Sequence, residues 1–328
     1  MDLYPLKFKP IYKERVWGGN RLSTVLGRKK KSGKVIGESW ELSSVSGNLS
    51  VVANGYLRDN NIQELIETYM GDITGDRVYE KFGIEFPLLF KLIDSAERLS
   101  VQVHPDDEIA LERHRAYGKT EMWYVMDAAE NSQIYVGFNK DLDRDEFRTR
   151  VANGSLPEVM NIEQAKKGDV FFLPAGRIHA IGENLLIAEI QQTSDVTYRI
   201  YDWGRENNPE TAREMHTQLA EDVIDYKRHE SYKTRYAPDE DSATELVNCK
   251  YFTTNLLSFS KKTDRRYAEL DSFVVYMCLE GSAKLVCDDD DGNGTVISTG
   301  ETVLIPAIFN SVCIIPEKDI KLLEVYIS

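Results

Sequence analysis

Long apolar runs are missing from this sequence. The longest ones, IEFPLLFKLI, LLIAEI and DSFVVYMCL, are well below the roughly 20 residues that a membrane-spanning helix requires. The segment MDLYPLKFKPIYKERVWGGN at the start alternates charged and aromatic side chains and contains no cleavable hydrophobic region, so we expect no signal peptide. The sequence therefore predicts a cytoplasmic protein that does not enter a membrane.

Positive charge is in deficit. The chain has 40 lysine and arginine residues against 54 aspartate and glutamate residues, a formal net charge of −14. Such a surface repels nucleic acids and anionic membranes, so neither is an expected partner. One basic cluster, Arg28 to Lys31 with Lys34, is best explained as a solvated loop. A mobile loop near an anionic substrate is the alternative explanation.

Cysteine and histidine are both rare. The four cysteines lie in the last third of the chain without CxxC spacing, which favours small buried side chains over disulfides or metal ligands. Of the five histidines, three lie in a charged RHR segment, a predicted helix and a predicted linker, namely His114, His216 and His229. Surface or packing roles suit these three, which leaves His104 and His179 as candidates for chemistry.

Alternating apolar and polar residues recur through most of the sequence, which indicates short strands. Helices are predicted in four places: from a cap at Asn60 or Asn61 through IQELIETYM, shortly before Phe82, twice within Asp141–Glu163, and from Pro209 through PETAREMHTQLAEDVID. Asparagine is a favoured helix cap, and proline is tolerated in a first helical turn. The expected fold class is mainly β with helical insertions.

An internal repeat organises the strands. GDVFFLPA, beginning at Gly168, matches GETVLIPA, beginning at Gly300, and an aromatic strand precedes each, EMWYVMDA and FVVYMCLEG. Two β-barrels of the same kind in tandem explain this pattern economically. The charged, poorly apolar segment His229–Glu245 is the best linker candidate. We therefore expect a first barrel with the functional site and helical insertions at 1–240, and a second barrel at 241–328.

Gln102, His104 and Glu121 form the first candidate site. The first two are two residues apart in the alternating run SVQVH, so they project from one face if this run is a strand. Glu121 belongs to the aromatic segment EMWYV, and the proline-flanked His179 follows the first repeat motif. One such histidine alone is better explained by a structural role. Together with a carboxylate, the two histidines predict a metal site that suits zinc or iron(II).

The pattern Gly168-x5-Pro174-x-Gly176-x2-His179, followed by Asn184, resembles the second signature of the cupin superfamily. In that superfamily the histidine is a metal ligand on a small jelly-roll barrel. The first cupin signature usually supplies a His-x-His pair and a glutamate shortly afterwards. Here the pair is Gln-x-His and the glutamate comes much later, which is a departure from the cupin pattern.

Gln-x-His-Pro followed by Lys-x-Glu is similar to the type I mannose-6-phosphate isomerases, and the likeness extends over nearly the whole chain. It includes WGG, GESWELS, FPLLFKLIDSAERLSVQVHPDD, GKTEMWYV, AGRIHAIG, EIQQTSDVTYRIYDWGR and EMHTQLAEDVIDYK. The compact length resembles the short bacterial form. The resemblance implies two tandem cupin-like jelly-roll barrels. Ile308-Phe309-Asn310 stands where the first barrel has Gly176 to His179, which implies that the second has lost its metal site.

The resemblance also implies one zinc ion, held by Gln102, His104, Glu121 and His179. The implied reaction is the reversible isomerisation of mannose 6-phosphate and fructose 6-phosphate, with a small phosphosugar as the substrate. By residue type Gln102 is the weakest ligand, and it could instead orient a ligand from outside the coordination shell. The reaction moves a proton between C1 and C2 through an enediol. It therefore needs a base, a cation near the enediolate and a positive group that holds the phosphate.

Five further residues are expected to serve this chemistry. Lys119, two residues before the glutamate ligand, could polarise or protonate a substrate oxygen. Arg199 lies in the alternating run TYRIY, where an inward arginine needs an anionic partner. It matches an arginine that is an active-site residue in the family, so the resemblance implies a catalytic role for it. Glu189 matches a family glutamate near the metal and could be the base or orient it. Lys91 and Ser100 match active-site positions of the family and are candidates for substrate binding together with Arg199. A solvated lysine, an outward arginine and a turn serine are the structural alternatives.

Two other functions are compatible with these residues. A non-catalytic sugar-binding or regulatory cupin would keep the barrel but would need no proton-transfer groups, so Lys119, Glu189 and Arg199 argue against it. An iron-dependent cupin oxygenase would also use two histidines and a carboxylate. Metal analysis and a test of oxygen dependence separate the oxygenase from the isomerase.

Overall fold

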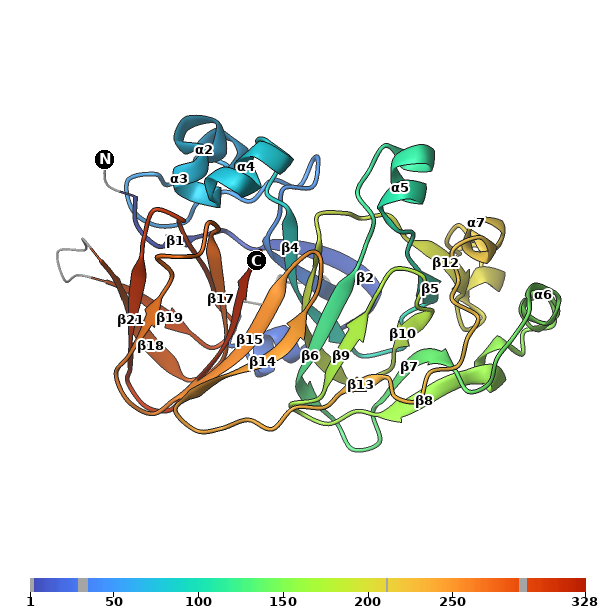
Figure 1. Cartoon of the computed structure of the whole chain (residues 1–328). Helices are drawn as coiled ribbons and strands as arrows, with labels where there is room; N and C mark the ends of the chain where they lie inside the picture. Colours follow the sequence, from blue (N-terminus) through green and yellow to red (C-terminus); the bar gives the residue numbers. More distant parts are fainter. Residues whose placement is uncertain (1–2, 29–34, 211, 289–293) are drawn as a thin grey trace. The chain divides into compact units, whose positions relative to one another are not determined.

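The computed structural model describes residues 3–28, 35–210, 212–288 and 294–328. The chain forms two compact units (Figure 1). The unit that we call the C-terminal unit combines Met1–Ile11, Trp40–Leu89 and Arg235–Ser328, and the unit that we call the site unit combines Tyr12–Ser39 and Phe90–Thr234. Of the basic cluster, Lys29–Lys31 and Lys34 lie outside the described residues. A functional division into 1–240 and 241–328 stays a prediction.

The site unit is built on two sheets with antiparallel pairings. The larger has the order β13-β9-β6-β11-β4-β2-β3 and the smaller the order β12-β5-β10-β7-β8. The strands of the larger sheet are β2 (Ile11–Gly19), β3 (Ile36–Leu42), β4 (Leu88–Ser95), β6 (Glu121–Ala128), β9 (Val170–Leu173), β11 (Leu185–Gln192) and β13 (Lys233–Thr234). Those of the smaller sheet are β5 (Val101–Val103), β7 (Gln133–Phe138), β8 (Met160–Gln164), β10 (His179–Ile181) and β12 (Tyr198–Tyr201).

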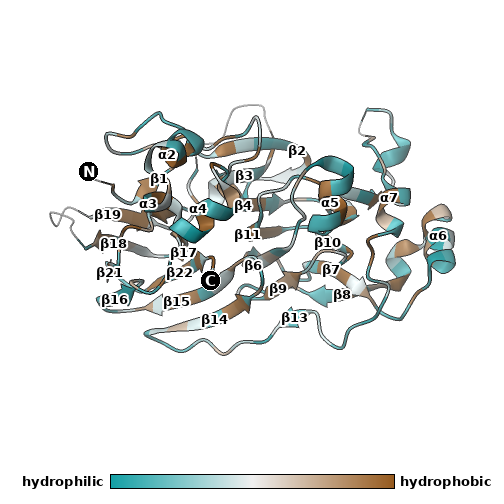
Figure 2. Ribbon diagram, turned by 45° about the horizontal axis from the view of Figure 1, so that its top comes forward, coloured by the Kyte–Doolittle hydropathy of each residue, from teal (hydrophilic) through white to brown (hydrophobic). Residues whose placement is uncertain are grey.

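Short helical segments complete the site unit: α1 (Arg21–Thr24), α5 (Asp107–His114), α6 (Arg144–Ala152), η1 (Leu156–Val159), η2 (Arg205–Asn207) and α7 (Thr217–Glu221). Apolar side chains from both sheets meet in one buried cluster, with Trp123 and Phe171 from the larger sheet and Val136 and Ile181 from the smaller. Figure 2 shows hydrophobic residues, in brown, along many of the strands. Within the described segments, no helix combines the length and apolar character needed to cross a membrane.

The C-terminal unit also contains two sheets, with the orders β1-β20-β17-β22-β15-β14 and β16-β21-β18-β19. The strands of the first are β1 (Leu6–Lys7), β14 (Ser242–Asn248), β15 (Thr253–Phe259), β17 (Val274–Glu280), β20 (Thr302–Ile305) and β22 (Ile320–Tyr326). Those of the second are β16 (Thr263–Arg266), β18 (Ser282–Cys287), β19 (Thr295–Ser298) and β21 (Ser311–Pro316). Its helices are α2 (Ile62–Tyr69), α3 (Gly71–Thr74) and α4 (Asp76–Phe82). The mainly β class predicted from the sequence is confirmed.

The predicted repeat is visible in the strand order of the two units. The orders β9-β6-β11-β4 and β20-β17-β22-β15 correspond, and so do β5-β10-β7-β8 and β16-β21-β18-β19. The repeat motif makes the same turn twice. Gly168 and Gly300 have φ angles of 91° and 82°, and their N–H groups donate to the carbonyls of Val125 and Cys278, both at 2.8 Å. This correspondence supports tandem copies, whereas closure of each sheet pair into a barrel stays a prediction.

Three of the four helix predictions are confirmed, and the short helix expected before Phe82 is α4. The side chain of Asn61 accepts hydrogen bonds from the first turn of α2, and Glu64 completes a capping box. The insertion at Asp141–Glu163 contains α6 and the short 3₁₀ helix η1, as the two apolar patches in that segment predicted. These two helices do not interrupt the sheet, because β7, which precedes them, and β8, which follows them, pair directly.

The long helix predicted from Pro209 is wrong for most of its length. Among the described residues of PETAREMHTQLAEDVID, only Thr217–Glu221 is helical. Ahead of this helix the chain is bonded to β12. The N–H of His216 donates to the carbonyl of Arg199 at 2.7 Å, and the N–H of Arg199 donates to Nδ1 of His216 at 3.2 Å. These bonds use backbone groups of an outermost strand that would otherwise need partners, so they compete with helix formation.

The predicted linker His229–Glu245 is partly ordered into strands. β13 pairs with β9 in the site unit, and β14 begins at Ser242 in the C-terminal unit. β13 has two residues, which is too short to show alternation in the sequence. The change from one unit to the other at Thr234 and Arg235 does fall inside this segment.

A buried carboxylate in the C-terminal unit is fully hydrogen-bonded. Glu324 on β22 is fully buried. Its oxygens accept hydrogen bonds from Nε and Nη2 of Arg265 and from Nδ2 of Asn255, each at 2.8 Å, and from the hydroxyl of Tyr267. The Arg265 side chain is only 27% exposed. A charged pair held in this way is tolerated because each member satisfies the other.

We expect Glu324→Ala to lower the free energy of unfolding by about 3 kcal/mol, because it leaves the guanidinium of Arg265 without its carboxylate. Replacing Glu324 and Arg265 together by methionine is expected to recover most of that loss, since no unpaired charge remains. Urea unfolding followed by tryptophan fluorescence measures both changes, and Glu245→Ala on the exposed side of β14 serves as the control. A double variant as unstable as Glu324→Ala would contradict this explanation.

Candidate active site

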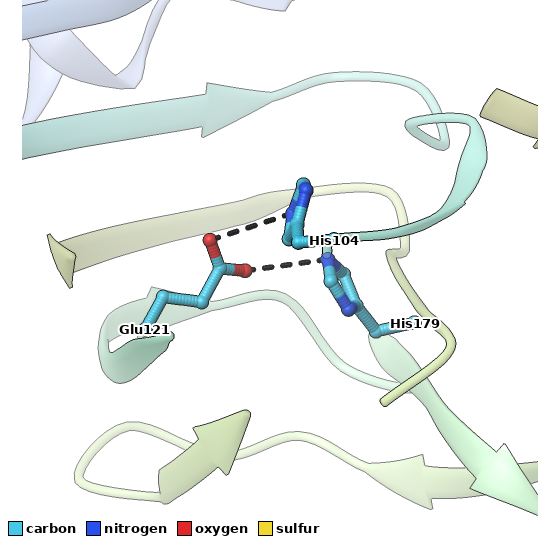
Figure 3. A group of neighbouring side chains, drawn as sticks. All are labelled: His104, Glu121 and His179. Carbon is cyan, nitrogen blue, oxygen red and sulfur yellow. Dashed lines mark ion pairs between the residues drawn. The ribbon is translucent and has the colours of Figure 1, made fainter. Parts of the chain in front are cut away.

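Three of the predicted metal ligands converge inside the site unit (Figure 3). Nε2 of His104 lies 3.6 Å from Oε2 of Glu121, and Nε2 of His179 lies 3.2 Å from Oε1 of the same carboxylate. Candidate ligand atoms of the three residues all lie within 4.8 Å of one another. Each residue is at most 2% exposed. In the described part of the chain, this is the one group of three or more acidic, histidine or cysteine residues placed to hold a metal ion.

The two sheets supply these side chains together. Gln102 on β5 stands opposite His179 on β10 and opposite Arg199 on β12 in the strand register. Directly opposed residues point to the same face of a sheet, so these three side chains share one face of the smaller sheet. Glu121 is the first residue of β6 in the larger sheet. His104 follows the last residue of β5, one position beyond the strand, and still reaches the group.

Gln102 lies beside these three buried residues. Its Nε2 is 3.3 Å from Nε2 of His179. Turning the amide group by half a rotation brings its oxygen, the atom that can ligate a metal, to the same place. The predicted juxtaposition of the Gln-x-His pair with Glu121 and His179 is therefore present in the fold.

Both histidines present the same nitrogen to the group. Nδ1 of His104 donates to the carbonyl of Val196 at 2.9 Å, and Nδ1 of His179 donates to the carbonyl of Arg177 at 2.8 Å. A carbonyl only accepts, so the hydrogen resides on Nδ1 and the lone pair on Nε2. This is the orientation that backbone carbonyls commonly impose on metal-binding histidines.

Several polar atoms of the group are buried and unsatisfied. Nε2 of His104 and both oxygens of Glu121 make no hydrogen bond of regular geometry, although charged neighbours lie close to them. Such atoms are rare in folded proteins and call for an explanation, and the binding of an ion is one. Two imidazole nitrogens and a carboxylate are a suitable donor set for zinc. The residues present therefore fit a divalent metal ion.

Burial controls the protonation of the group. It lowers the pKa of His179 to about 4 and that of His104 well below its usual value, and the positive charge of Lys119 acts in the same direction. Burial raises the pKa of Glu121 to about 7, which Lys119 opposes. Nζ of Lys119 lies 3.2 Å from Oε2 of Glu121. Neutral imidazoles are the form of histidine that binds metals, and Lys119 stands beside the group as predicted.

Lys91 and Glu189 form a buried ion pair. Nζ of Lys91 donates to Oε1 of Glu189 at 2.8 Å and to Oε1 of Gln191 at 2.5 Å, and Nε1 of Trp123 donates to Oε2 of Glu189 at 2.8 Å. Burial alone would raise the pKa of Glu189, but Lys91 outweighs it and the pKa falls to about 2. Burial would likewise lower the pKa of Lys91, and Glu189 raises it above its usual value. A carboxylate held in this way is a weak base, which favours an orienting role.

The sequence reasoning missed Gln191 and Trp123. Gln191 is fully buried and stands opposite Glu121 in the register of β11 and β6. The ring of Trp123 meets that of His179 edge-on, with centroids 5.2 Å apart. Strand alternation could have identified both residues, because residues two apart on a strand point to the same face. Trp123 lies two residues after Glu121, and Gln191 lies two residues after Glu189.

Ser100 and Arg199 form a second polar pair. Nε of Arg199 donates to Oγ of Ser100 at 3.2 Å, and Nη1 donates to the carbonyl of Glu214 at 2.7 Å. Burial lowers the pKa of Arg199, the neighbouring Arg213 adds to this, and Asp202 opposes it. Ser100 is buried and Arg199 is partly buried. Arg199 stands opposite Gln102 in the strand register, so its positive charge lies on the face of the smaller sheet that carries Gln102 and His179, and the hydroxyl group of Ser100 is bonded to it.

Comparison with known proteins supports the predicted resemblance. Residues 5–134 match the family model for the catalytic domain of type I phosphomannose isomerases. The chain is similar to mannose-6-phosphate isomerase ManA of Bacillus subtilis strain 168, with 34% identity over 292 residues that cover 87% of this chain and 89% of that protein. It is also similar to the probable mannose-6-phosphate isomerase GmuF of the same strain, with 32% identity over 314 residues that cover 93% and 94% of the two chains.

The fold agrees with a solved structure. The crystal structure of a mannose 6-phosphate isomerase from Bacillus subtilis matches this chain with a TM-score of 0.85 and 28% sequence identity. The match covers 99% of each chain. A match over 99% of the chain includes both units, and it extends beyond residues 5–134, which the family model covers.

Proposed function

Because the chain belongs to the type I phosphomannose isomerase family, we propose that it interconverts mannose 6-phosphate and fructose 6-phosphate by proton transfer through an enediol. We further propose that one zinc ion is held by Gln102, His104, Glu121 and His179. The observation that carries this proposal is the convergence of two imidazole Nε2 atoms on a buried carboxylate that lacks regular hydrogen bonds. One anionic and three neutral ligands would leave a zinc ion with net positive charge.

The remaining polar residues have separate proposed roles. Zinc would supply stabilisation of the negative charge that develops on the sugar oxygens. Lys119, buried beside Glu121, would polarise or protonate a substrate oxygen. Arg199 and Ser100 would bind the anionic substrate, and Arg199 would also stabilise the negative charge that develops on it during the reaction. Glu189 would hold the Lys91 ammonium in place for the substrate, because its low pKa makes it a poor proton acceptor.

The rival functions are less well supported. A non-catalytic sugar-binding or regulatory cupin would have no use for Lys119 and the Lys91–Glu189 pair, because burying charges costs free energy. An iron-dependent oxygenase would use the same histidines and carboxylate, but the matched relatives carry isomerase names. A cytoplasmic location stays a prediction from the sequence.

Metal removal tests the proposed function. We expect exhaustive chelation to lower the conversion of mannose 6-phosphate to fructose 6-phosphate by at least about a hundredfold, the scale expected when a group that stabilises developing charge is lost. A coupled assay that consumes fructose 6-phosphate measures the rate, and added zinc should restore it. Oxygen consumption by the iron-loaded protein is the control for an oxygenase. Activity that survives complete metal removal, or no activity with zinc bound, would overturn the proposal.

A further inference from the structure

The segment Glu214–His216 contacts Arg199 at three points. Nη1 of Arg199 donates to the carbonyl of Glu214 at 2.7 Å. The backbone N–H of Arg199 donates to Nδ1 of His216 at 3.2 Å, and the backbone N–H of His216 donates to the carbonyl of Arg199 at 2.7 Å. The segment therefore binds both the main chain and the guanidinium of this arginine.

These bonds lie on the outer side of the smaller sheet. β12 is the outermost strand of that sheet, and its inner neighbour is β5. The N–H and the carbonyl of Arg199 both bond to His216, so they point away from β5. In a sheet interior a further strand would satisfy these two groups. Here His216 does so, with one ring nitrogen and one backbone N–H.

The chemistry of the imidazole makes this contact specific. Nδ1 accepts a hydrogen bond only if it carries no proton. Burial lowers the pKa of His216, Glu214 opposes this, and the charges of Arg199 and His114 add to it. Nε2 lies 3.8 Å from Oε2 of Glu214, and the ring centroid is 6.2 Å from that of Tyr198. The neutral ring with its hydrogen on Nε2 is the form that fits these surroundings.

We propose that His216 is a positioning residue for Arg199, which fixes the main chain of the arginine so that its guanidinium meets the phosphosugar. This inference rests on the proposed function, in which Arg199 contacts the substrate. Arg199 stands opposite Gln102 in the register, so a shift of its backbone would move the guanidinium relative to the proposed metal ligands. A misplacement of about 1 Å in an active site can cost about a hundredfold in rate.

Two substitutions of His216 separate its hydrogen bond from its volume. His216→Asn keeps an acceptor close to the position of Nδ1, whereas His216→Phe keeps a ring and loses the acceptor. We expect His216→Phe to lower kcat/KM about tenfold, which is less than the about hundredfold loss for a full misplacement of the guanidinium. We expect kcat/KM of His216→Asn to stay within about twofold of that of the unchanged protein. An asparagine variant as impaired as the phenylalanine variant, or a fully active phenylalanine variant, would overturn the proposal.

A double-mutant cycle distinguishes positioning from general damage to β12. In an Arg199→Ala background, His216→Phe is expected to change kcat/KM by less than about twofold, because the side chain through which it acts is absent. An equal tenfold loss in both backgrounds would assign His216 a merely structural role. His229→Phe is the matched control, since the imidazole of that histidine pairs with Asp225.

Two further readouts do not depend on turnover. Metal content should be unchanged in all the His216 variants, because His216 is not one of the proposed ligands. Amide hydrogen exchange in the peptide that covers Tyr198–Tyr201 should be faster in His216→Phe than in His216→Asn. Equal rates would contradict the positioning role of His216. Absence of isomerase activity in the unchanged, zinc-loaded protein would instead refute the proposed function, so the two failures are distinguishable.

Discussion

Replacing His179 by alanine is expected to remove the metal ion and the activity together. The imidazole is almost completely buried, its Nδ1 is held by the carbonyl of Arg177, and its Nε2 faces Oε1 of Glu121 at 3.2 Å. Alanine supplies no donor atom at this position. Loss of a residue that only orients a ligand already costs ten- to a hundredfold in metal affinity in other proteins, so we expect the loss of the ligand itself to exceed about a hundredfold.

Zinc content after equilibrium dialysis, together with the coupled isomerase assay, measures this result. His114→Ala is a suitable control, because that histidine bonds to the hydroxyl of Tyr198 and is not a proposed ligand. The circular dichroism of His179→Ala should match that of the unchanged protein, since the strand register of β10 with β7 does not depend on this side chain. Zinc retained at full occupancy in His179→Ala would contradict the ligand assignment.

The candidate metal site could be predicted because its information is local in the sequence. A spacing of two on a predicted strand singled out Gln102 and His104, and the proline-marked repeat motif singled out His179. Only the family resemblance supported Gln102 as a ligand. The orientation of the imidazoles could not be predicted in the same way. It depends on the carbonyls of Val196 and Arg177, and a backbone carbonyl leaves no mark in the residue types.

The helix predicted from Pro209 failed for a related reason. Its apolar spacing and its proline in the first turn are genuine helix signals. The competing bonds come from Arg199, which a local pattern does not include. The same contacts make Glu214–His216 part of the surroundings of Arg199, so a segment expected to be an ordinary surface helix lies next to a proposed active-site residue.

The register of the strands shows what the two copies of the repeat share. Glu324 stands opposite Tyr276 as Glu189 stands opposite Trp123. Both carboxylates are buried, and each is bound to a cationic side chain, Arg265 in one copy and Lys91 in the other. A buried carboxylate at this point of the strand is thus common to both units.

The positions of the proposed metal ligands differ between the copies. Glu121 stands opposite Leu173, and the equivalent place opposite Ile305 is taken by Val274. An apolar side chain cannot ligate a metal, so this substitution supports the prediction that the second copy lacks a metal site. The retained ion pair in the C-terminal unit then has a structural explanation, which the Glu324→Ala prediction tests.

Arg199→Ala is expected to have the opposite signature to His179→Ala, with the metal retained and the turnover lost. The side chain of Arg199 bonds to Ser100 and to the carbonyl of Glu214, and neither belongs to the proposed ligand set. We expect kcat to fall by about a hundred- to a thousandfold, the usual effect of losing a donor aimed at developing negative charge. Arg199→Lys should recover only part of the rate, because an ammonium cannot reproduce the two-sided hydrogen bonding of a guanidinium.

Comparison of zinc content and kcat in the same preparations separates the two roles. Arg144→Ala provides a matched loss of positive charge in the site unit, because Arg144 is exposed and pairs with Asp222. If Arg199→Ala lost zinc as well as turnover, the arginine would support the metal group itself. If it kept both, the anion-binding role would be wrong. Zinc retained with turnover lost would show that Arg199 acts on the substrate. The proposed positioning role of His216 depends on this result.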